Sequence, residues 1–431
     1  MRSPIPDYLA EALAAVEHDD SGATADYIPE LASADPDRLG VTIATTDGRT
    51  YGAGDTRTPF SIQSISKPFV YALALADRGF DAVLEKVGVE PTGDAFNEIS
   101  LEPGSGRPQN PMINAGAIAT HTLVGHEDMS AEHRVERVIE GLSAFAGRRL
   151  DVDEDVFASE IGHAFRNRAL ANLLRAYEVT SENPVVSVAG YTRQCSLIVT
   201  TEDLAVMAAT LANGGVNPLT GVEVVPRRVV RQTLSVMATC GMYDGAGDWM
   251  TRVGVPAKSG VAGGLIGALP GQVGIATFSP RLDRHGNSVR GVDLFQRFTS
   301  DMGMHLMEVP ASTSSVVRRR RSLGSGPLAT DVLSLQGALR FAAAERVVRE
   351  FVDRPPTQRR VAISLRRVQS LDDVSRRMLL EVVRRLSLDG HDVFVIDPDG
   401  VLPDPDPGTG GRLTVLAGLG DIVSPPADPV T

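Results

Sequence analysis

The segment "FSIQSISKPF" at residues 60–69 places a serine hydroxyl three positions before a lysine amine. Pro68 has no backbone N–H and fits best in the first turn of a helix, so a helix is predicted to begin near residues 64–66, with Ser64 and Lys67 on one face. A serine attacks a carbonyl carbon only when a neighbouring group takes its proton, so Lys67 would have to be neutral. Burial and the positive end of the helix dipole both favour the neutral amine. The pair is therefore a candidate nucleophile and base, and the free N–H groups of the first turn could stabilise an oxyanion.

A second segment, "KSGVAGG" at residues 258–264, strengthens this interpretation. Serine β-lactamases and penicillin-binding proteins combine an S-x-x-K helix start with a later K-[ST]-G strand on the other side of the serine. Each segment alone has a simpler explanation: an N-cap serine with a surface lysine for the first, and a glycine-rich turn before a strand for the second. Their occurrence together, in this order, favours the catalytic interpretation.

The chain resembles the bacterial glutaminase family, which has the β-lactamase-like fold, over about residues 5–308. The segments that carry the resemblance are "DYIPELA" (26–32), "FSIQSISKPFVYALAL" (60–75), "VGVEPTGDAFNEISLEPGSGRPQNPMINAGAIAT" (87–120), "GYTRQCSL" (190–197), "ANGGVNPLTG" (212–221), "CGMYDGAGDW" (240–249) and "KSGVAGG" (258–264).

The resemblance implies hydrolysis of the side-chain amide of L-glutamine to L-glutamate and ammonia through an acyl-enzyme intermediate, without a cofactor or a metal. Ser64 would be the nucleophile and Lys67 its base. The hydroxyls of Tyr27 and Tyr243 would assist proton transfer, and the backbone of Ser64 and Val261 would form the oxyanion hole. The resemblance also implies a homo-oligomer, either a dimer or a tetramer.

The family further implies a set of residues that bind glutamine. These are Ser64, Asn114, Glu160, Asn167, Tyr191, Tyr243 and Val261. A carboxylate suits the substrate ammonium, and amide and hydroxyl donors suit its carboxylate. Glu160 and Asn167 are seven positions apart and would share one face of a single helix. Without the family, Glu160 would be interpreted as part of a solvated helix face, Asn114 as the cap of a tightly packed helix, and the tyrosines as packing residues.

Two other functions remain open from the residues. A β-lactam-hydrolysing or peptidoglycan enzyme would share the serine and the lysine, but it would normally be exported, and the chain has no S-D-N triplet; "SEN" at residues 181–183 is the nearest match. A non-catalytic regulator, in which the first domain only senses glutamine, is the other alternative. Measured turnover of glutamine, asparagine and penicillin would separate all three.

The elements that position these residues indicate an α+β fold. Asp47 and Gly48 join two β-branched runs, a strong hairpin signal, and "GQVGIATFSP" (271–280) and "SVRGVDLF" (288–295) read as further strands. Helices are predicted at 131–146, 165–177 and 201–211, the last with a capping box from Thr200 and Asp203. We therefore expect an antiparallel sheet closed by the two ends of residues 1–310, with a helical subdomain inserted between them.

The C-terminal part is predicted to be a separate small α/β domain. Residues 311–329 contain "STSSVVRRRRSLGSG" and read as a linker, in which the arginine run is interpreted as solvated rather than as a docking patch. Residues 330–418 alternate strands and helices and resemble a STAS domain, which could bind a protein or a small ligand. Where regulatory STAS domains carry a phosphorylated serine, this chain has Val374, so control by phosphorylation there is not expected. Residues 419–431 are predicted to be a flexible tail.

Composition limits the possible partners. The net charge is −12 and the pI is near 5.2, which argues against nucleic acid or an anionic membrane surface as the main partner. Only Cys195 and Cys240 are present, too few for a disulfide framework or a four-cysteine zinc site. The start of the sequence lacks the pattern of a secretory signal, and no long apolar run is present, so a soluble cytoplasmic protein is expected.

Overall fold

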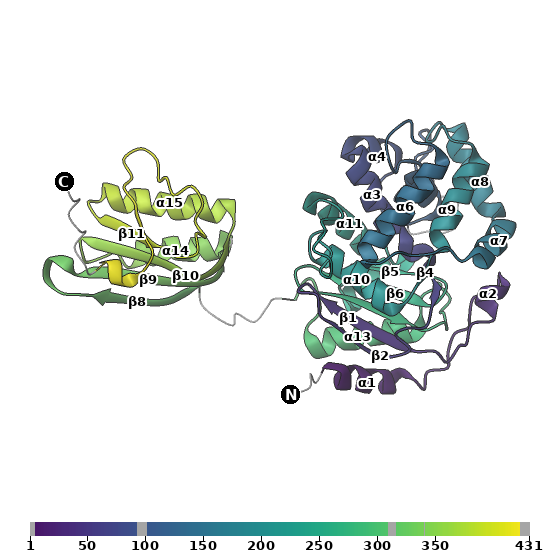
Figure 1. Cartoon of the computed structure of the whole chain (residues 1–431), viewed down its shortest axis with the longest axis horizontal. Coiled ribbons are helices and arrows are strands. Elements are labelled where there is room, and N and C mark those ends of the chain that lie inside the picture. Colours follow the sequence, from purple (N-terminus) through teal and green to yellow (C-terminus); the bar gives the residue numbers. More distant parts are fainter. Residues whose placement is uncertain (1–4, 93–100, 309–315, 340, 423–431) are drawn as a thin grey trace. The chain divides into compact units, whose positions relative to one another are not determined.

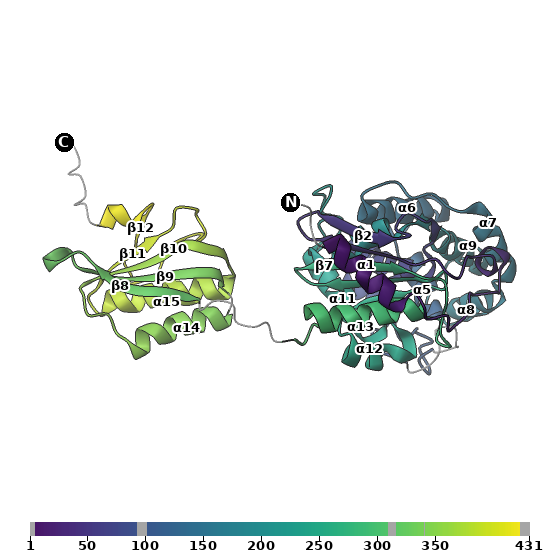
Figure 2. The ribbon, with the colours of Figure 1, turned by 90° about the horizontal axis from the view of Figure 1, so that it is seen from below.

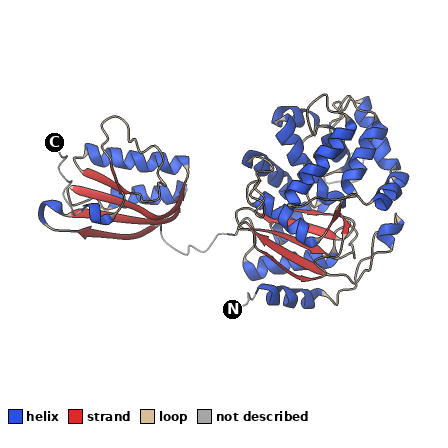
Figure 3. Ribbon diagram, in the orientation of Figure 1, coloured by secondary structure: helices blue, strands red, loops and turns tan. Residues whose placement is uncertain are grey.

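The structure is a computed structural model that describes residues 5–92, 101–308, 316–339 and 341–422. It divides into two compact units, Met1–Glu308 and Val309–Thr431, which are described separately (Figures 1 and 3). Residues 93–100, which belong to one of the segments that resemble the glutaminase family, lie outside the described residues, as do 423–431 of the expected tail. No helix in the described ranges has both the length and the apolar run that crossing a bilayer requires.

A five-stranded antiparallel sheet forms the centre of the first unit and confirms the expected closure by the two ends of the segment. The strands, in sheet order, are β2 (Thr50–Gly54), β1 (Gly40–Thr45), β7 (Val273–Phe278), β6 (Gly264–Leu269) and β5 (Ala257–Ser259). The hairpin at Asp47 and Gly48 forms as predicted, and Gly48 has a φ of 87° that suits glycine. Val41 of β1 pairs with Thr277 of β7, so the early and late parts of the chain meet inside one sheet.

Helices cover both faces of this sheet; Figure 2 shows α1 and α13 in front of one face, and Figure 1 labels α10. Helices α1 (Ile5–Val16) and α13 (Val289–Met302) pack on one face, against a cluster that includes Val41 and Ile275. Helix α10 (Thr201–Ala212) packs on the other face, in a cluster that includes Ala276. The neighbouring residues Ile275 and Ala276 therefore face opposite sides of the sheet, as expected for a strand that is buried on both sides. Helix α10 begins at the predicted capping box of Thr200 and Asp203.

The helical subdomain lies between the two parts of the sheet sequence. Its elements are α3 (Ser66–Arg78), α4 (Phe80–Lys86), α5 (Asn114–Thr122), α6 (Ala131–Ala146), α7 (Glu154–His163), α8 (Phe165–Ala176), α9 (Pro184–Cys195) and α11 (Arg227–Cys240). Helix α2 (Pro29–Ala32) precedes β1, and α12 (Ala246–Arg252) packs on the sheet face that carries α1 and α13. Two short strands, β3 (Phe60–Ser61) and β4 (Ile198–Val199), pair beside it. The helices predicted at 131–146 and 165–177 are confirmed as α6 and α8.

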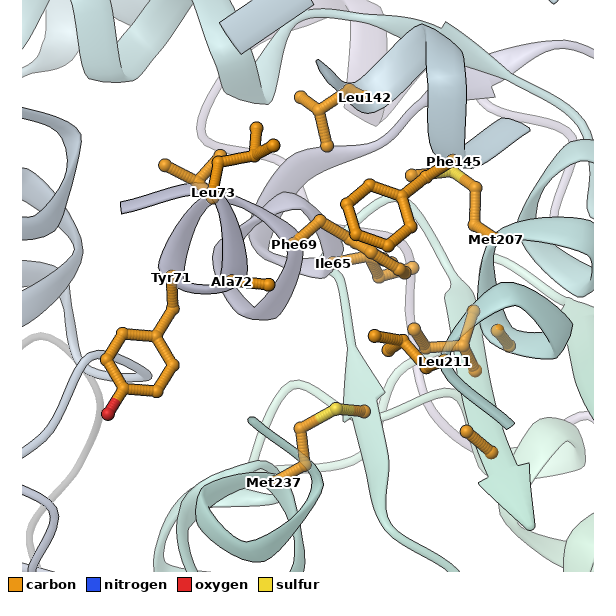
Figure 4. Close-up of a cluster of buried hydrophobic side chains, with 14 of the residues drawn as sticks. Ile65, Phe69, Tyr71, Ala72, Leu73, Leu142, Phe145, Met207, Leu211 and Met237 are labelled. Atoms are coloured by element: carbon orange, nitrogen blue, oxygen red, sulfur yellow. The ribbon is translucent and has the colours of Figure 1, made fainter. Parts of the chain in front are cut away.

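Helix α3 is the buried centre of the subdomain (Figure 4). Every residue of this helix from Ser66 to Leu75 is buried. The ring of Phe69 lies 5.0 Å from that of Phe145 on α6. Helix α6 approaches closely because Gly141 has no side chain, and a Cβ there would meet Leu73 at 2.4 Å. Packing on all sides fixes the start of α3, the place where the candidate nucleophile and base lie.

One expected strand is a helix. The segment 288–295 is predicted as a strand from the sequence, but these residues begin α13. The Ser288 side chain caps this helix by accepting a hydrogen bond from the Gly291 N–H. Leu294, Phe295 and Phe298 are buried against the sheet at the spacing of a helical stripe, so tertiary packing overrides local preference.

The second unit is a five-stranded sheet with two helices on one face. The strands, in sheet order, are β12 (Thr414–Leu416), β11 (Asp392–Ile396), β10 (Arg360–Leu371), β9 (Thr330–Leu339) and β8 (Val317–Leu323). Strands β9 to β12 are parallel, and β8 is an antiparallel edge. Helices α14 (Phe341–Asp353) and α15 (Asp373–Leu388) pack on one face through the cluster that contains Leu333, Ile363 and Val383. The expected strand and helix alternation is therefore confirmed.

Two boundary predictions for this unit are wrong. Residues 317–323, expected within a linker, form β8 because Arg320 contacts Glu350 at 3.5 Å and stacks on Phe351 while the strand pairs with β9. Residues 419–422, expected in a flexible tail, form a short 3-10 helix, η4, whose Ile422 is buried against the other face of the sheet.

Candidate active site

A cavity of about 350 Å³ lies in the first unit, a size that suits a small molecule. Seven of the residues singled out from the sequence line it: Tyr27, Ser64, Asn114, Glu160, Asn167, Tyr191 and Val261. They come from η1 (Gln63–Ile65), α5, α7, α8, α9 and two loops, so folding brings together positions that span more than half of the chain. Tyr243 and Lys67 contact lining residues: Tyr243 is hydrogen-bonded to Ser64, and Lys67 to Asn114.

Ser64 lies in η1, the 3-10 turn that leads directly into α3. Its side chain is partly buried and is hydrogen-bonded to Tyr243. The predicted helix start is thus correct to within two residues. The serine hydroxyl faces the cavity at the amino end of a long buried helix, where the dipole favours negative charge.

Lys67 is 1% exposed and makes two hydrogen bonds. Its Nζ donates to the Met112 carbonyl oxygen at 3.0 Å and to Asn114 Oδ1 at 2.7 Å. Burial lowers the pKa of Lys67 to about 7. A neutral amine has two N–H groups and one lone pair, and both N–H groups are taken by oxygens that only accept. The lone pair of the neutral amine is therefore left to take a proton.

Tyr243 lies in the short 3-10 helix η2 (Tyr243–Gly245) and is hydrogen-bonded to Ser64. Burial raises the pKa of Tyr243, so the phenol keeps its proton at neutral pH. Its backbone has a φ of 54°, a region that residues with a Cβ rarely occupy. Such conformations persist where surrounding contacts hold them.

Glu160 is held by two donors at the cavity wall. The Tyr27 hydroxyl donates to Glu160 Oε1 at 2.8 Å, and Gln63 Nε2 donates to the same oxygen at 3.0 Å. Burial raises the pKa of Glu160, and these two hydrogen bonds oppose that shift by stabilising the carboxylate. The expectation that Glu160 shares one helix with Asn167 is wrong, because α7 ends at His163 and α8 begins at Phe165.

Three polar side chains form a connected row along the cavity. Asn114 Nδ2 donates to Asn167 Oδ1 at 3.1 Å, and the Tyr191 hydroxyl donates to Asn114 Oδ1 at 3.4 Å. Asn114 is the first residue of α5, and its side chain makes no cap; the alternative role considered from the sequence is not observed. Asn114 instead links the base Lys67 to the cavity wall.

Gln63 is a site residue that the sequence analysis did not identify. It has a φ of 51°, lies next to Ser64, and contacts Glu160. Glutamine gives no local signal for such a conformation; only its position beside the candidate nucleophile in a strained turn could have indicated it. His163 and Arg166 also line the cavity and were not predicted.

Comparison with known proteins agrees with this site. The family model described as Glutaminase matches residues 22–307. The glutaminase of Corynebacterium glutamicum is 50% identical over 401 residues, which cover 93% of this chain and 96% of that protein. The glutaminase of Clavibacter michiganensis is 53% identical over 297 residues, which cover 69% of this chain and 90% of that protein.

Solved structures give the same result. The crystal structure of Mglu matches with a TM-score of 0.86 and 50% identity, covering 93% of this chain and all (100%) of that one. A probable glutaminase of Bacillus subtilis matches with a TM-score of 0.65 and 33% identity, covering 70% of this chain and 98% of that one. By sequence and by structure, the chain belongs to the glutaminase family and is a glutamine amidohydrolase.

Proposed function

We propose that this glutaminase hydrolyses L-glutamine through an acyl-enzyme formed on Ser64, with Lys67 as the base. The observation that supports the proposal most strongly is the environment of Lys67: a buried amine with a pKa of about 7, both N–H groups of its neutral form donated to oxygens, one helical turn after a serine that faces the cavity. Only a lysine held in this way can act as a base near neutral pH.

In the first step, the Ser64 proton passes to Lys67 Nζ as Oγ attacks the carbonyl carbon of the substrate side chain. The carbonyl oxygen becomes an oxyanion, for which we propose the backbone N–H groups of Ser64 and Val261 as donors. The C–N bond then breaks, and the leaving nitrogen takes a proton from Lys67 through Tyr243, so that ammonia departs. Water attacks the acyl group by the reverse sequence and releases L-glutamate.

The other thiol and hydroxyl groups of the cavity fit this step less well. Cys195 also lines the cavity, but burial raises its pKa to about 11, so the thiol stays protonated. The Tyr27 hydroxyl is bonded to Glu160, so we assign it to positioning that carboxylate rather than to proton transfer at Ser64.

For the substrate, we propose that Glu160 receives the α-ammonium of glutamine and that Asn114, Asn167 and Tyr191 lie near its α-carboxylate. A structure of Mglu in its L-glutamate binding form, 45% identical with a TM-score of 0.85, supports an amino-acid ligand in this family. Glutamine is placed in this orientation because its α-ammonium then lies against the negative charge of the Glu160 carboxylate.

Glu160→Gln is expected to raise KM for glutamine about ten- to a hundredfold, because a charge-assisted hydrogen bond to the ammonium is lost while the shape is kept. The kcat should change less. Steady-state kinetics with Glu154→Gln, an exposed residue of the same helix, as the matched control would test this. A KM equal to that of the unaltered enzyme would remove Glu160 from the substrate site.

We further propose that the first unit has the β-lactamase-like fold and that the second is a STAS-like module, which serves docking or ligand sensing in a cytoplasmic homo-oligomer, a dimer or tetramer. The strand and helix alternation of the second unit supports the STAS-like assignment. The position of phosphorylation is occupied by Val374, so a phosphorylated serine is not part of the proposal.

A chain that ends at Glu308 is expected to fold and to hydrolyse glutamine with a kcat within about twofold of the full chain, because every proposed site residue lies in the first unit. The 297-residue alignment with the Clavibacter glutaminase, which covers 90% of that protein, supports this independence. Circular dichroism and saturating-glutamine assays would test it. A well-folded but inactive product would mean that the second unit is needed to order the site.

A further inference from the structure

Lys258 is a second lysine buried beside Ser64, and the mechanism above gives it no part. The chain has 42 Lys and Arg residues, of which three are lysines: Lys67, Lys86 and Lys258. Lys67 and Lys258 are 1% and 0% exposed, whereas Lys86 is partly exposed on α4. In an arginine-rich chain, the two buried amines near Ser64 thus both belong to lysines, and both are removed from water.

The contacts of Lys258 converge on one residue. From strand β5, its Nζ donates to the Tyr243 hydroxyl oxygen at 2.6 Å and to the Ser259 carbonyl oxygen at 2.7 Å. The same nitrogen lies 3.9 Å from the centroid of the Tyr243 ring, and Lys67 Nζ lies 5.7 Å from it. The tyrosine thus lies against both amines.

The surroundings of Lys258 disfavour a charged amine. Among the ion pairs of the described residues, the only lysine is Lys86, so neither buried amine has a carboxylate partner there. A buried charge without a partner is unfavourable, and an arginine, unlike a lysine, could not give up its proton. Burial and the neighbouring Lys67 lower the pKa of Lys258 well below its usual value. Lys258 therefore acts through its hydrogen bonds and not through an ion pair.

These hydrogen bonds determine which way the Tyr243 hydroxyl points. A phenol has one proton, and its oxygen here accepts from Lys258, so the proton is left for another partner. That partner is Ser64, to which Tyr243 is hydrogen-bonded. The contact also anchors a residue whose φ of 54° requires support from its surroundings.

We propose that Lys258 is a positioning residue, which holds the Tyr243 hydroxyl with its proton directed toward Ser64 Oγ and the departing ammonia. The inference rests on the proposed roles of Ser64 and Tyr243 and adds to them. Lys258 does not line the cavity, so its effect should be on the chemical step and not on glutamine binding.

The first test is Lys258→Met, which keeps an unbranched side chain and removes the N–H donors. The expected result is a kcat lower by about ten- to a hundredfold, the range of losing one buried hydrogen bond, with KM within about twofold. Lys86→Met is the matched control and should leave both constants unchanged. A wild-type kcat in folded Lys258→Met protein would overturn the inference.

A double-mutant cycle with Tyr243→Phe shows whether Lys258 acts through the tyrosine. If it does, the double variant should be about as slow as Tyr243→Phe alone. Losses that multiply would mean that Lys258 acts elsewhere, and the inference would be wrong. A wild-type kcat in Tyr243→Phe would instead contradict the proposed role of Tyr243 itself, and with it the inference. If Lys258→Met does not fold, Lys258→Leu, which also lacks an N–H donor, takes its place in the same cycle, with the same criterion.

Discussion

Ser64→Ala is expected to lower kcat for glutamine hydrolysis by at least about 10⁴-fold, because the variant has no group that can form the acyl-enzyme. The Ser64 side chain faces the cavity and contributes little to the core, so the melting temperature should change by only a few degrees. Binding of L-glutamate should persist, since Glu160 and the row of polar side chains remain. Steady-state assays, thermal unfolding and calorimetric titration with L-glutamate would measure the three quantities.

Ser300→Ala is the matched control, because Ser300 is an exposed serine of α13. It should keep full activity. A folded Ser64→Ala protein with more than a few per cent of the wild-type kcat would show that another group attacks the substrate.

Lys67→Arg and Lys67→Met are both expected to lose about 10² to 10⁴ in kcat, the usual contribution of a general base. The arginine variant is the informative one, since a guanidinium keeps the positive charge but cannot accept a proton at neutral pH. If Lys67 acted only as a cation, arginine would preserve much of the rate. Retained activity in Lys67→Arg and loss in Lys67→Met would therefore contradict the role of base.

The pH profile of the unaltered enzyme gives a second test of Lys67. Burial lowers its pKa to about 7, so the amine is protonated below that pH and neutral above it. Because only the neutral form accepts the Ser64 proton, kcat/KM should fall as the pH decreases through about 7. A profile that is flat between about pH 6 and 8 would mean that no group with this pKa is needed in the free enzyme.

The start of α3 could be predicted because its signals are local. Pro68 fixes the first turn, and Ser64 and Lys67 share a face by their spacing alone. The capping box of α10 is equally local. By contrast, α13 has strand-like residues and becomes a helix because its apolar stripe packs on the sheet, which no local pattern shows.

The candidate site depends more on contacts between distant parts of the chain. The acceptors for Lys67 are Met112 and Asn114, 45 and 47 positions away, so its environment follows from packing and not from the S-x-x-K spacing. The break between α7 and α8, which separates Glu160 from Asn167, falls at Ala164, and the only local signal is Gly162 in the last turn of α7. The family resemblance assigned Glu160 and Asn114 to the substrate site, whereas residue chemistry alone left a solvated helix face and a helix cap open for them.

The most direct test of the acyl-enzyme on Ser64 is chemical labelling of the nucleophile. A glutamine analogue in which a diazoketone replaces the side-chain amide should alkylate the group that attacks the substrate carbonyl, and peptide mass spectrometry would locate it. We predict one adduct per chain, on the peptide that contains Ser64, with protection by L-glutamate and no label in Ser64→Ala. An adduct on Cys195, or labelling of Ser64→Ala at the wild-type rate, would contradict Ser64 as the nucleophile.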